Sequence, residues 1–285
     1  MTSTDTLTEQ STSRTLRTPS WRLHYNEAGK GHPVVLLHGS GPGATGWSNF
    51  APNIPALAEH FRVIALDAPG WGASDPGLPA TYDHPNAVLE LLDALGIERA
   101  ALVGNSMGGS TAVTFAARYP ERVSHLATMG VVALTEFPTV YGASDGPSEG
   151  LKLLFETYRR PTLENMRRLV DVMTYGQVED AEQLAQERLD NALAHPKHLA
   201  NFVEGLATGG PVQTRAALKD VTAISAPALL IHGRDDRVVS HEHSLRLLPV
   251  LQDARLVLLN KCGHWAQLEH ADRFNRLLVD FITRD

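Results

Sequence analysis

The stretch Ala100-Ala101-Leu102-Val103-Gly104-Asn105-Ser106-Met107-Gly108 decides the fold of this chain. Its first four residues form an apolar run that is typical of a short buried strand. A helix is expected to follow, ending near Tyr119 because Pro120 cannot continue it. A serine flanked two positions away by glycines, between such a strand and such a helix, has the form of a nucleophile elbow. The alternative is a glycine-rich turn that carries a structural serine.

The elbow needs these residue types because the turn is very tight. Gly104 and Gly108 keep side chains out of the turn, which then presents the Ser106 oxygen at the carboxyl end of the sheet. The N–H of Met107 lies at the start of the helix, where it points at a developing oxyanion. The sequence therefore predicts Ser106 as a nucleophile and Met107 as a backbone donor.

Strand-like and helix-like patterns alternate on both sides of this stretch. An amphipathic helix is expected at 85–95 and another from 271 onward. This alternation predicts an α/β fold with a mostly parallel central sheet and helices on both faces. The expected strands are residues 21–26, 33–38, 62–67, 100–103, 123–129, 228–231 and 255–259.

The alternation breaks between about 131 and 226, where no segment reads as a strand and helices are expected at 162–174, 179–194 and 196–207. An all-helical insertion between two strands is typical of a lid over an active site. The alternative is a set of helices that pack at the edge of the sheet. We expect a flexible N-terminal arm at 1–20, a core at 21–134 and 220–285, and a lid at 135–219.

A serine nucleophile needs a base, and a carboxylate to orient that base. Of thirteen histidines, His264 follows the last expected strand, where loops converge on the active site. Asp235 and Asp236 follow the strand at 228–231, and the order Ser, Asp, His is that of α/β-hydrolases. We predict a triad of Ser106, Asp236 and His264. In the reverse assignment Asp235 is the acid; otherwise it is a loop residue paired with Arg234 or Arg237.

The loop His38-Gly39-Ser40-Gly41-Pro42-Gly43 follows the strand at 33–38 and is expected to supply the second oxyanion donor. Backbone N–H groups at Ser40 and Gly41 can approach a bound carbonyl closely because few side chains intervene. The alternative is a phosphate cradle, but the loop lacks the lysine and the Ser/Thr of a P-loop and is not Gly-x-Gly-x-x-Gly.

Composition excludes several function classes. The net charge of −7, without a Lys/Arg cluster, argues against nucleic acid as a partner. The longest apolar runs are too short to span a bilayer. Cys262 is the one cysteine, so no intrachain disulfide forms, which suits the cytoplasm. The first twenty residues do not resemble a secretory signal.

Four segments together resemble the meta-cleavage-product hydrolases, which are carbon–carbon bond hydrolases of the α/β-hydrolase superfamily that act in bacterial degradation of aromatic compounds. The likeness extends over nearly the whole chain after about Trp21 and includes the expected lid. It implies hydrolysis of a 2-hydroxy-6-oxo-2,4-dienoate to a carboxylic acid and a 2-hydroxy-2,4-dienoate. The four segments are 38–43 with Trp47-Ser48-Asn49, 104–109, 233–237 and Cys262-Gly263-His264-Trp265.

The resemblance also implies roles for particular residues. Arg188 would bind the substrate carboxylate or enolate, Asn49 and Asn105 would hydrogen-bond the dienol end, and Trp265 would pack on the dienoate. The backbones of Ser40, Gly41 and Met107 would hold oxygens. Taken alone, Arg188 reads as a solvated charge, Asn49 as a helix cap and Trp265 as core. The family implies a small-molecule substrate, no metal or organic cofactor, and a homo-oligomer, a dimer or higher.

The chain departs from the family at Ser40, where relatives usually have glycine, and at 130–133, where relatives are often richer in glycine and proline. Serine at position 40 would be strained if φ there were positive. Two other functions remain open: a carboxylesterase or lactonase on the same fold, and a non-catalytic small-molecule binding protein.

Overall fold

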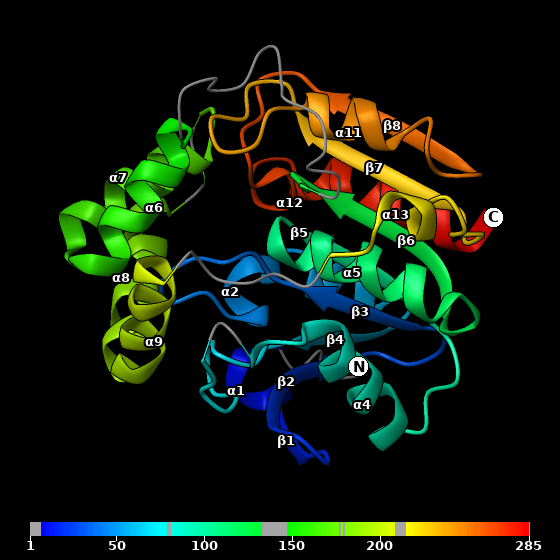
Figure 1. The fold of residues 1–285 in the computed structure, drawn as a ribbon, viewed down its shortest axis with the longest axis horizontal. Coiled ribbons are helices and arrows are strands. Elements are labelled where there is room, and N and C mark those ends of the chain that lie inside the picture. The colour runs from blue at the N-terminus through cyan, green and yellow to red at the C-terminus, as the bar shows by residue number, and fades with distance from the viewer. Residues whose placement is uncertain are drawn as a thin grey trace, which may run out of the picture.

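An eight-stranded, mostly parallel sheet forms the centre of the computed structural model, which describes residues 7–78, 81–132, 147–176, 178, 180–208 and 215–284 (Figure 1). The strand order is β1-β2-β4-β3-β5-β6-β7-β8, in which β1 and β2 are antiparallel to their neighbours and all other pairs are parallel. The predicted α/β class is confirmed. The strands are β1 (Ser13–Arg17), β2 (Arg22–Ala28), β3 (Pro33–Leu37), β4 (Arg62–Leu66), β5 (Ala100–Asn105), β6 (Val123–Met129), β7 (Ala228–Gly233) and β8 (Ala254–Leu259).

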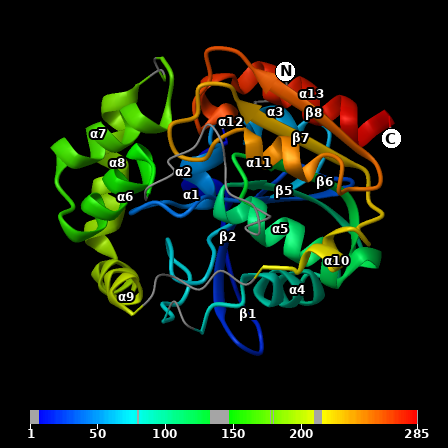
Figure 2. The ribbon, with the colours of Figure 1, turned by 45° about the horizontal axis from the view of Figure 1, so that its top comes forward.

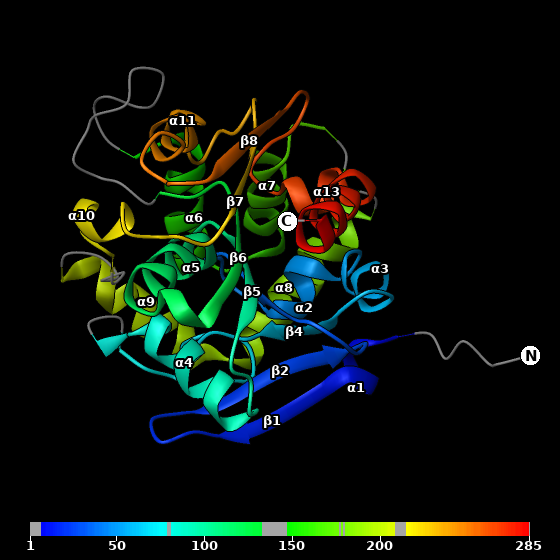
Figure 3. The ribbon, with the colours of Figure 1, turned by 90° about the vertical axis from the view of Figure 1, so that its right-hand side faces the viewer.

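Helices cover both faces of the sheet, as the edge-on view in Figure 3 shows. Two separate apolar clusters fill the layers between them. One cluster lies under α4 (His84–Ala94), α5 (Met107–Arg118), α10 (Leu218–Val221) and α11 (Glu242–Leu247). The other lies under α2 (Gly46–Phe50), α3 (Ile54–Ala58), α12 (Ala266–Glu269) and α13 (Ala271–Arg284). The central strands β3 and β5 are largely apolar because both of their faces are buried. Strand β6 is also mostly buried, but it contains Ser124, His125 and Thr128.

Four helices form a separate layer beside the sheet: α6 (Glu149–Arg159), α7 (Leu163–Met173), α8 (Ala181–Ala194) and α9 (Pro196–Ala207) (Figures 1 and 2). Between Val131 and Ala226 the described residues contain helices and no strand, as the sequence predicts. The expected start of this lid at 135 lies outside the described residues. Its expected end at 219 falls inside α10, which packs on α5 of the core, so we propose that the lid ends before Leu218.

The N-terminal segment corrects a prediction. Residues 1–20 were expected to be a flexible arm, but α1 (Glu9–Thr12) and β1 are ordered, and β1 pairs antiparallel with β2. The Asn26 side chain donates to the Glu9 carbonyl at 2.8 Å and to Thr12 Oγ1 at 2.9 Å. Hydropathy does not reveal such a strand because backbone hydrogen bonds along an exposed edge, rather than buried side chains, hold most of it.

A buried histidine connects this N-terminal segment to the rest of the sheet through hydrogen bonds. His24 on β2 lies with Nε2 2.9 Å from Ser13 Oγ and Nδ1 2.7 Å from Asp67 Oδ2. Asp67 also accepts hydrogen bonds from the backbone N–H groups of Gly46 and Ala73. Burial opposes protonation of His24, but its bond to Asp67 raises its pKa above the ordinary value.

Candidate active site

Ser106 occupies a strained turn between β5 and α5. Its φ of 53° and ψ of −113° lie in a region that L-residues rarely adopt. The backbone is so close on both sides that a Cβ at Gly104 would lie 2.3 Å from the Gly108 carbonyl oxygen, and one at Gly108 would lie 2.1 Å from the Leu37 carbonyl oxygen. The glycines at 104 and 108 are therefore required by the contacts of the turn, as the sequence predicts for a nucleophile elbow.

His264 and Asp236 are brought together from the loops after β8 and β7. The Nδ1 atom of His264 lies 2.7 Å from Asp236 Oδ2, and both side chains are buried. The other oxygen, Oδ1, accepts the backbone N–H groups of Val238 and Val239 at 2.7 and 2.9 Å. Because the carboxylate accepts from Nδ1, Nε2 of His264 is left available to accept a proton.

The carboxylate of the neighbouring Asp235 points to a different partner. Asp235 Oδ1 pairs with Arg234 at 3.0 Å, near the surface. This geometry supports Asp236, and not Asp235, as the acid that orients His264.

Ser106 and His264 line one cavity. Within the described residues no hydrogen bond joins the Ser106 hydroxyl to the His264 ring. Nucleophile–base contacts often tighten only when substrate binds, so this arrangement is compatible with a catalytic pair.

The Asp236 carboxylate is held in its charged form. Burial alone would raise its pKa, but attraction to His264 and the hydrogen bonds from His232 and His264 outweigh that effect, and the pKa lies far below its ordinary value. A charged carboxylate fixes the tautomer of His264 and stabilises the imidazolium that forms when the ring takes a proton.

The oxyanion loop after β3 is held by His38. This buried ring accepts the Ala68 N–H at Nε2, which leaves Nδ1 to donate to the Gly39 carbonyl at 2.8 Å. Burial lowers the pKa of His38, in agreement with a neutral ring. Ser40 does not have positive φ: Ser106, Asp180 and Lys261 are the non-glycine residues with positive φ in the described part of the chain. The serine that departs from the family pattern is therefore not strained.

Two of the three predicted backbone donors are well placed. Ser40 and Met107 line the cavity beside Ser106, and Met107 begins helix α5. Gly41 also lines the cavity, but its N–H donates to the Gly39 carbonyl at 3.2 Å and its own carbonyl accepts from Trp71 Nε1. The structure thus favours Ser40 and Met107 as oxyanion donors over Gly41.

The cavity measures about 350 Å³ and lies between the sheet edge and the lid. All of the predicted site residues line it except Asp236, which sits behind His264. Sequence reasoning missed its polar residues outside the motifs and its apolar lid residues, since neither group follows a recognisable spacing. These are Ser110, Ser148, Leu151, Leu154, Arg215, Ser240 and His243.

Arg188 on α8 is the most unusual side chain of this cavity. It is 1 % exposed, and the guanidinium makes no hydrogen bond or ion pair with the described residues. Its Cζ lies 4.4 Å from the ring centroid of Trp265, so the cation stacks over the indole. Burial lowers its pKa to about 10, which leaves the group charged at neutral pH. The sequence alone suggested a solvated charge; the structure instead buries it in the cavity wall.

Asn49 and Asn105 both present a side-chain oxygen without a partner. The Asn49 amide donates to the Thr45 carbonyl, and the Asn105 amide donates to the carbonyls of Met129 and His264. Oδ1 of each is buried and accepts no hydrogen bond in the described structure. Two free acceptors in a cavity suit a ligand that carries a hydroxyl donor.

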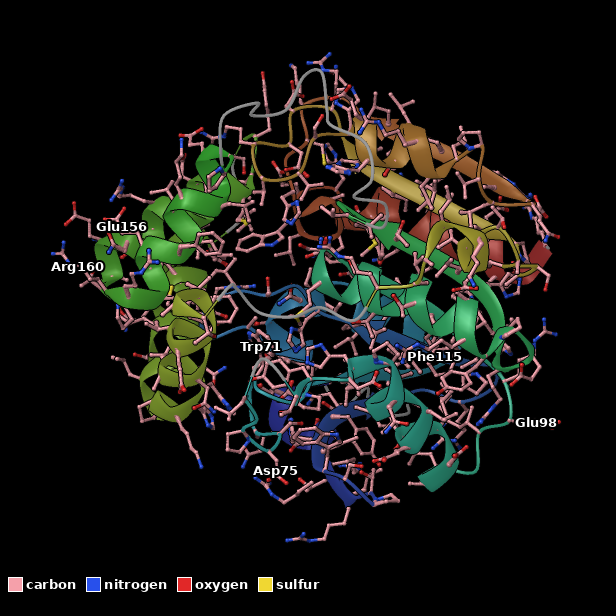
Figure 4. The ribbon with its side chains drawn as sticks, viewed as in Figure 1. Trp71, Asp75, Glu98, Phe115, Glu156 and Arg160 are labelled. Atoms are coloured by element: carbon pink, nitrogen blue, oxygen red, sulfur yellow. The ribbon has the colours of Figure 1, made fainter. Side chains whose placement is uncertain are left out.

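The lid meets the core around Trp71, which is labelled in Figure 4. The indole Nε1 donates to Tyr158 Oη at 3.0 Å, and Phe202 of α9 stacks on Tyr158 with ring centroids 3.7 Å apart. These contacts form part of an apolar cluster that the lid helices share with the core.

Neither a metal site nor a membrane segment emerges from the described residues. No group of three or more His, Cys, Asp or Glu side chains there could hold a metal ion. No helix there is long and apolar enough to cross a membrane.

Comparison with known proteins agrees with this geometry. Residues 32–271 match the family model of the alpha/beta hydrolase fold. The chain is 47% identical to a 2-hydroxy-6-oxononadienedioate/2-hydroxy-6-oxononatrienedioate hydrolase of Paraburkholderia phymatum, over 99% of both chains. It is 44% identical to a 2-hydroxy-6-oxo-6-phenylhexa-2,4-dienoate hydrolase of Comamonas testosteroni, over 92% of this chain and 91% of the other.

Among solved structures, the 2-hydroxy-6-oxo-6-phenylhexa-2,4-dienoate hydrolase of Rhodococcus superposes with a TM-score of 0.82 at 30% identity, covering 96% of this chain and 98% of the other. These relatives share the fold and span the full length of the chain. On these matches the chain belongs to the meta-cleavage-product hydrolases of the α/β-hydrolase superfamily.

Proposed function

We propose that this enzyme hydrolyses a carbon–carbon bond in a 2-hydroxy-6-oxo-2,4-dienoate, giving a carboxylic acid and a 2-hydroxy-2,4-dienoate. One observation carries the proposal: the Arg188 guanidinium is buried in the cavity, charged, and without an anion. A buried cation without a partner is costly unless a ligand supplies the opposite charge. The C1 carboxylate of a dienoate is such a ligand, and a guanidinium binds it through paired hydrogen bonds.

The remaining groups at this end of the cavity fit the rest of the dienol. We assign the unpartnered oxygens of Asn49 and Asn105 to the C2 hydroxyl, and the Trp265 ring, which lines the same cavity, to packing against the conjugated chain. As the hydroxyl gives up its proton and C5 gains one, the dienol becomes a ketone. In that form C1 to C5 can accept the electron pair of the bond to C6.

Ser106 performs the cleavage in this scheme. The nucleophile attacks the C6 carbonyl, or activates a water molecule that does so, while Nε2 of His264 takes the hydroxyl proton. The N–H groups of Ser40 and Met107 stabilise the oxyanion that forms on C6. The C5–C6 bond then breaks, its electrons enter the dienolate, and water completes the carboxylic acid.

We further propose that the acyl group carries a second carboxylate. The cavity is also lined by Arg215 and His243 together with Ser110, Ser148 and Ser240. An anionic acyl chain suits this polar wall better than a phenyl ring does. The dioate named for the Paraburkholderia relative has such a chain.

Bleaching of a yellow ring-fission dienol tests the reaction. The purified protein should bleach the dienedioate faster than the 6-phenyl dienoate, with a kcat/KM ratio of about tenfold or more, since a phenyl ring offers the polar side chains of the cavity neither a charge nor a hydrogen-bond partner. Arg215→Met should lower kcat/KM for the dioate and leave the phenyl compound nearly unchanged. Equal loss on both substrates would contradict the acyl-end assignment and leave the reaction intact.

The second candidate is a carboxylesterase or lactonase, since the Ser106, His264 and Asp236 set serves ester hydrolysis equally well. Rapid turnover of nitrophenyl esters and lactones without bleaching of any dienol would favour it. Binding of dienoates that is unaffected by Ser106→Ala, without turnover of any of these compounds, would instead indicate a non-catalytic binding protein.

The proposal extends to the location, the oligomeric state and the cofactors of the enzyme. We propose a cytoplasmic homo-oligomer, a dimer or larger, that acts on a small molecule without metal or organic cofactor. Support for the location is the buried Cys262, whose thiol pKa is raised by burial and which has no second cysteine to pair with. Light scattering at micromolar concentration measures the assembly directly.

A further inference from the structure

A second histidine contacts the Asp236 carboxylate. His232 lies near the end of β7, four residues before Asp236, and is fully buried. Its Nε2 atom lies 3.2 Å from Asp236 Oδ2, the oxygen that also contacts His264, and 3.0 Å from the Val239 carbonyl oxygen. The scheme above assigns it no role.

The contacts of His232 fix where its protons are. Both groups that face Nε2, a carboxylate and a carbonyl, are acceptors, so Nε2 must carry a hydrogen. On the other side Nδ1 lies 2.7 Å from Ser244 Oγ of α11, whose hydroxyl can donate to it. Both ring nitrogens of His232 therefore have partners in the tautomer that carries its hydrogen on Nε2. Val239 and Asp236 share that hydrogen.

His232 completes the hydrogen bonding of Asp236. Oδ1 receives the N–H groups of Val238 and Val239, and Oδ2 receives Nδ1–H of His264. Oδ2 also lies 3.2 Å from Nε2 of His232, whose hydrogen it shares with the Val239 carbonyl. A carboxylate has about four acceptor directions, and here each is used. A carboxylate so engaged cannot rotate to offer His264 another oxygen, and it is a weaker base toward the proton on Nδ1.

We propose that His232 is a positioning residue: its Nε2–H bond to Asp236 holds the carboxylate in the orientation that aims His264 at Ser106 and keeps the shared proton on His264 Nδ1. The inference rests on the roles proposed above for Ser106, His264 and Asp236. The competing view is that His232 merely fills the space between β7 and α11 and caps the Val239 carbonyl.

Two substitutions separate these views. In His232→Gln the amide nitrogen reaches the place of Nε2 and can donate to Asp236, but the partner of Ser244 is lost. In His232→Asn the amide lies at the level of Nδ1, so Ser244 keeps a partner while Asp236 loses its donor. Leu230→Ala, two residues earlier on the same face of β7, is the matched control because it destabilises the buried strand without touching a hydrogen bond of Asp236.

The measurements are kcat, the pH profile of kcat/KM and the NMR signal of the His264 Nδ1 proton. For His232→Asn we expect kcat to fall about tenfold with KM little changed, because only the aim of the base is altered. The acidic limb of the profile should move to higher pH by about half a unit, because a carboxylate with one donor fewer attracts the imidazolium more strongly. The Nδ1 proton should change its chemical shift.

His232→Gln should keep the wild-type profile and proton shift, and Leu230→Ala should lower the melting temperature alone. If Asn and Gln variants lose activity equally, or if the profile and the proton shift of the Asn variant match wild type, His232 is only structural. The NMR measurement needs no substrate, so it decides the matter even if the wild-type protein bleaches no dienol and the proposed reaction is wrong. A nitrophenyl ester then replaces the dienol for the rate measurements.

Discussion

The backbone N–H of His264 donates to the carbonyl oxygen of Met173, the last residue of lid helix α7, at 2.7 Å. The loop that carries the base is therefore bound to the lid as well as to the core. Glu269 strengthens this link, because its carboxylate accepts the N–H groups of Gly263, Tyr175 and Gly176. These bonds tie the position of the His264 loop to the C-terminal end of α7.

Removal of the Glu269 carboxylate should loosen this coupling. Glu269→Ala leaves three backbone N–H groups without their acceptor, which should cost about 1–3 kcal/mol of stability. We expect kcat to fall about tenfold, since His264 is then less well aimed, while Glu269→Gln, which keeps one oxygen, should lose less. Stopped-flow bleaching and thermal unfolding measure both effects. Full activity of the Ala variant despite a lowered melting temperature would show that the lid contact does not set the position of His264.

The nucleophile and the base should each be indispensable. Ser106→Ala and His264→Ala should lower kcat about 1,000-fold or more, and the double variant should lose little beyond either one, because the two act as a unit. Circular dichroism checks that the fold is kept. Near-normal turnover by either single variant would remove that residue from the proposed triad.

The two adjacent aspartates provide a sharper comparison. Asp236→Asn should lower kcat by roughly 1,000-fold, because the amide no longer fixes the tautomer of His264. Asp235→Asn should keep near-wild-type rates, since Asp235 pairs with Arg234 near the surface. The reverse ranking of the two variants would transfer the acid role to Asp235.

Arg188 should contribute to function at the expense of stability. Arg188→Met removes a buried charge that has no partner in the described structure, so it should stabilise the protein by about 1–3 kcal/mol and raise the melting temperature by roughly 2 °C or more. It should lower kcat/KM for dienoates about 100-fold or more and affect neutral esters far less. A lower melting temperature for this variant would indicate that stacking on Trp265 outweighs the cost of burying the charge.

Asp236 also predicts how stability depends on pH. Its pKa in the folded protein is below the ordinary value of 3.8, so its contribution is fully present above that value and is lost as pH falls toward the folded pKa. The difference in melting temperature between wild type and Asp236→Asn should thus shrink as pH falls below about 4. Asp235→Asn is the reference for loss of a negative charge from the same loop. A difference that grows on acidification would contradict the charged state of Asp236.

Sequence alone predicted those parts of the fold whose signal is local. Apolar runs mark β3 and most of β5 because both of their faces are buried, and Gly104 is required by its contact with Gly108 in the same turn. The N-terminal strand β1 was missed because it has one strongly apolar residue, Leu16, and is held by pairing with β2.

The residues of the site also differ in how far the sequence alone predicts their positions. Ser106, Asp236 and His264 follow strands whose ends must meet, so their neighbourhood follows from topology. The burial of Arg188 does not, because it depends on how α8 packs against the cavity wall, and the helix pattern alone made it a solvated charge. His232 was equally invisible, since a histidine inside a buried strand has no sequence signal of its own until Asp236, Val239 and Ser244 surround it.

The hydrogen-bonded side chains of Ser13, His24 and Asp67 resemble a catalytic triad in residue type and distance, although they lie in the N-terminal part of the sheet. Their hydroxyl, imidazole and carboxylate are spaced like a serine-protease motif, at 2.9 and 2.7 Å. Ser13, however, has an ordinary extended backbone at the end of the four-residue helix α1. Its hydroxyl hydrogen-bonds to the His24 ring and so links β1 to β2. What distinguishes the two serines is their surroundings, because Ser106 lines a cavity and has a strained backbone, whereas Ser13 has neither feature.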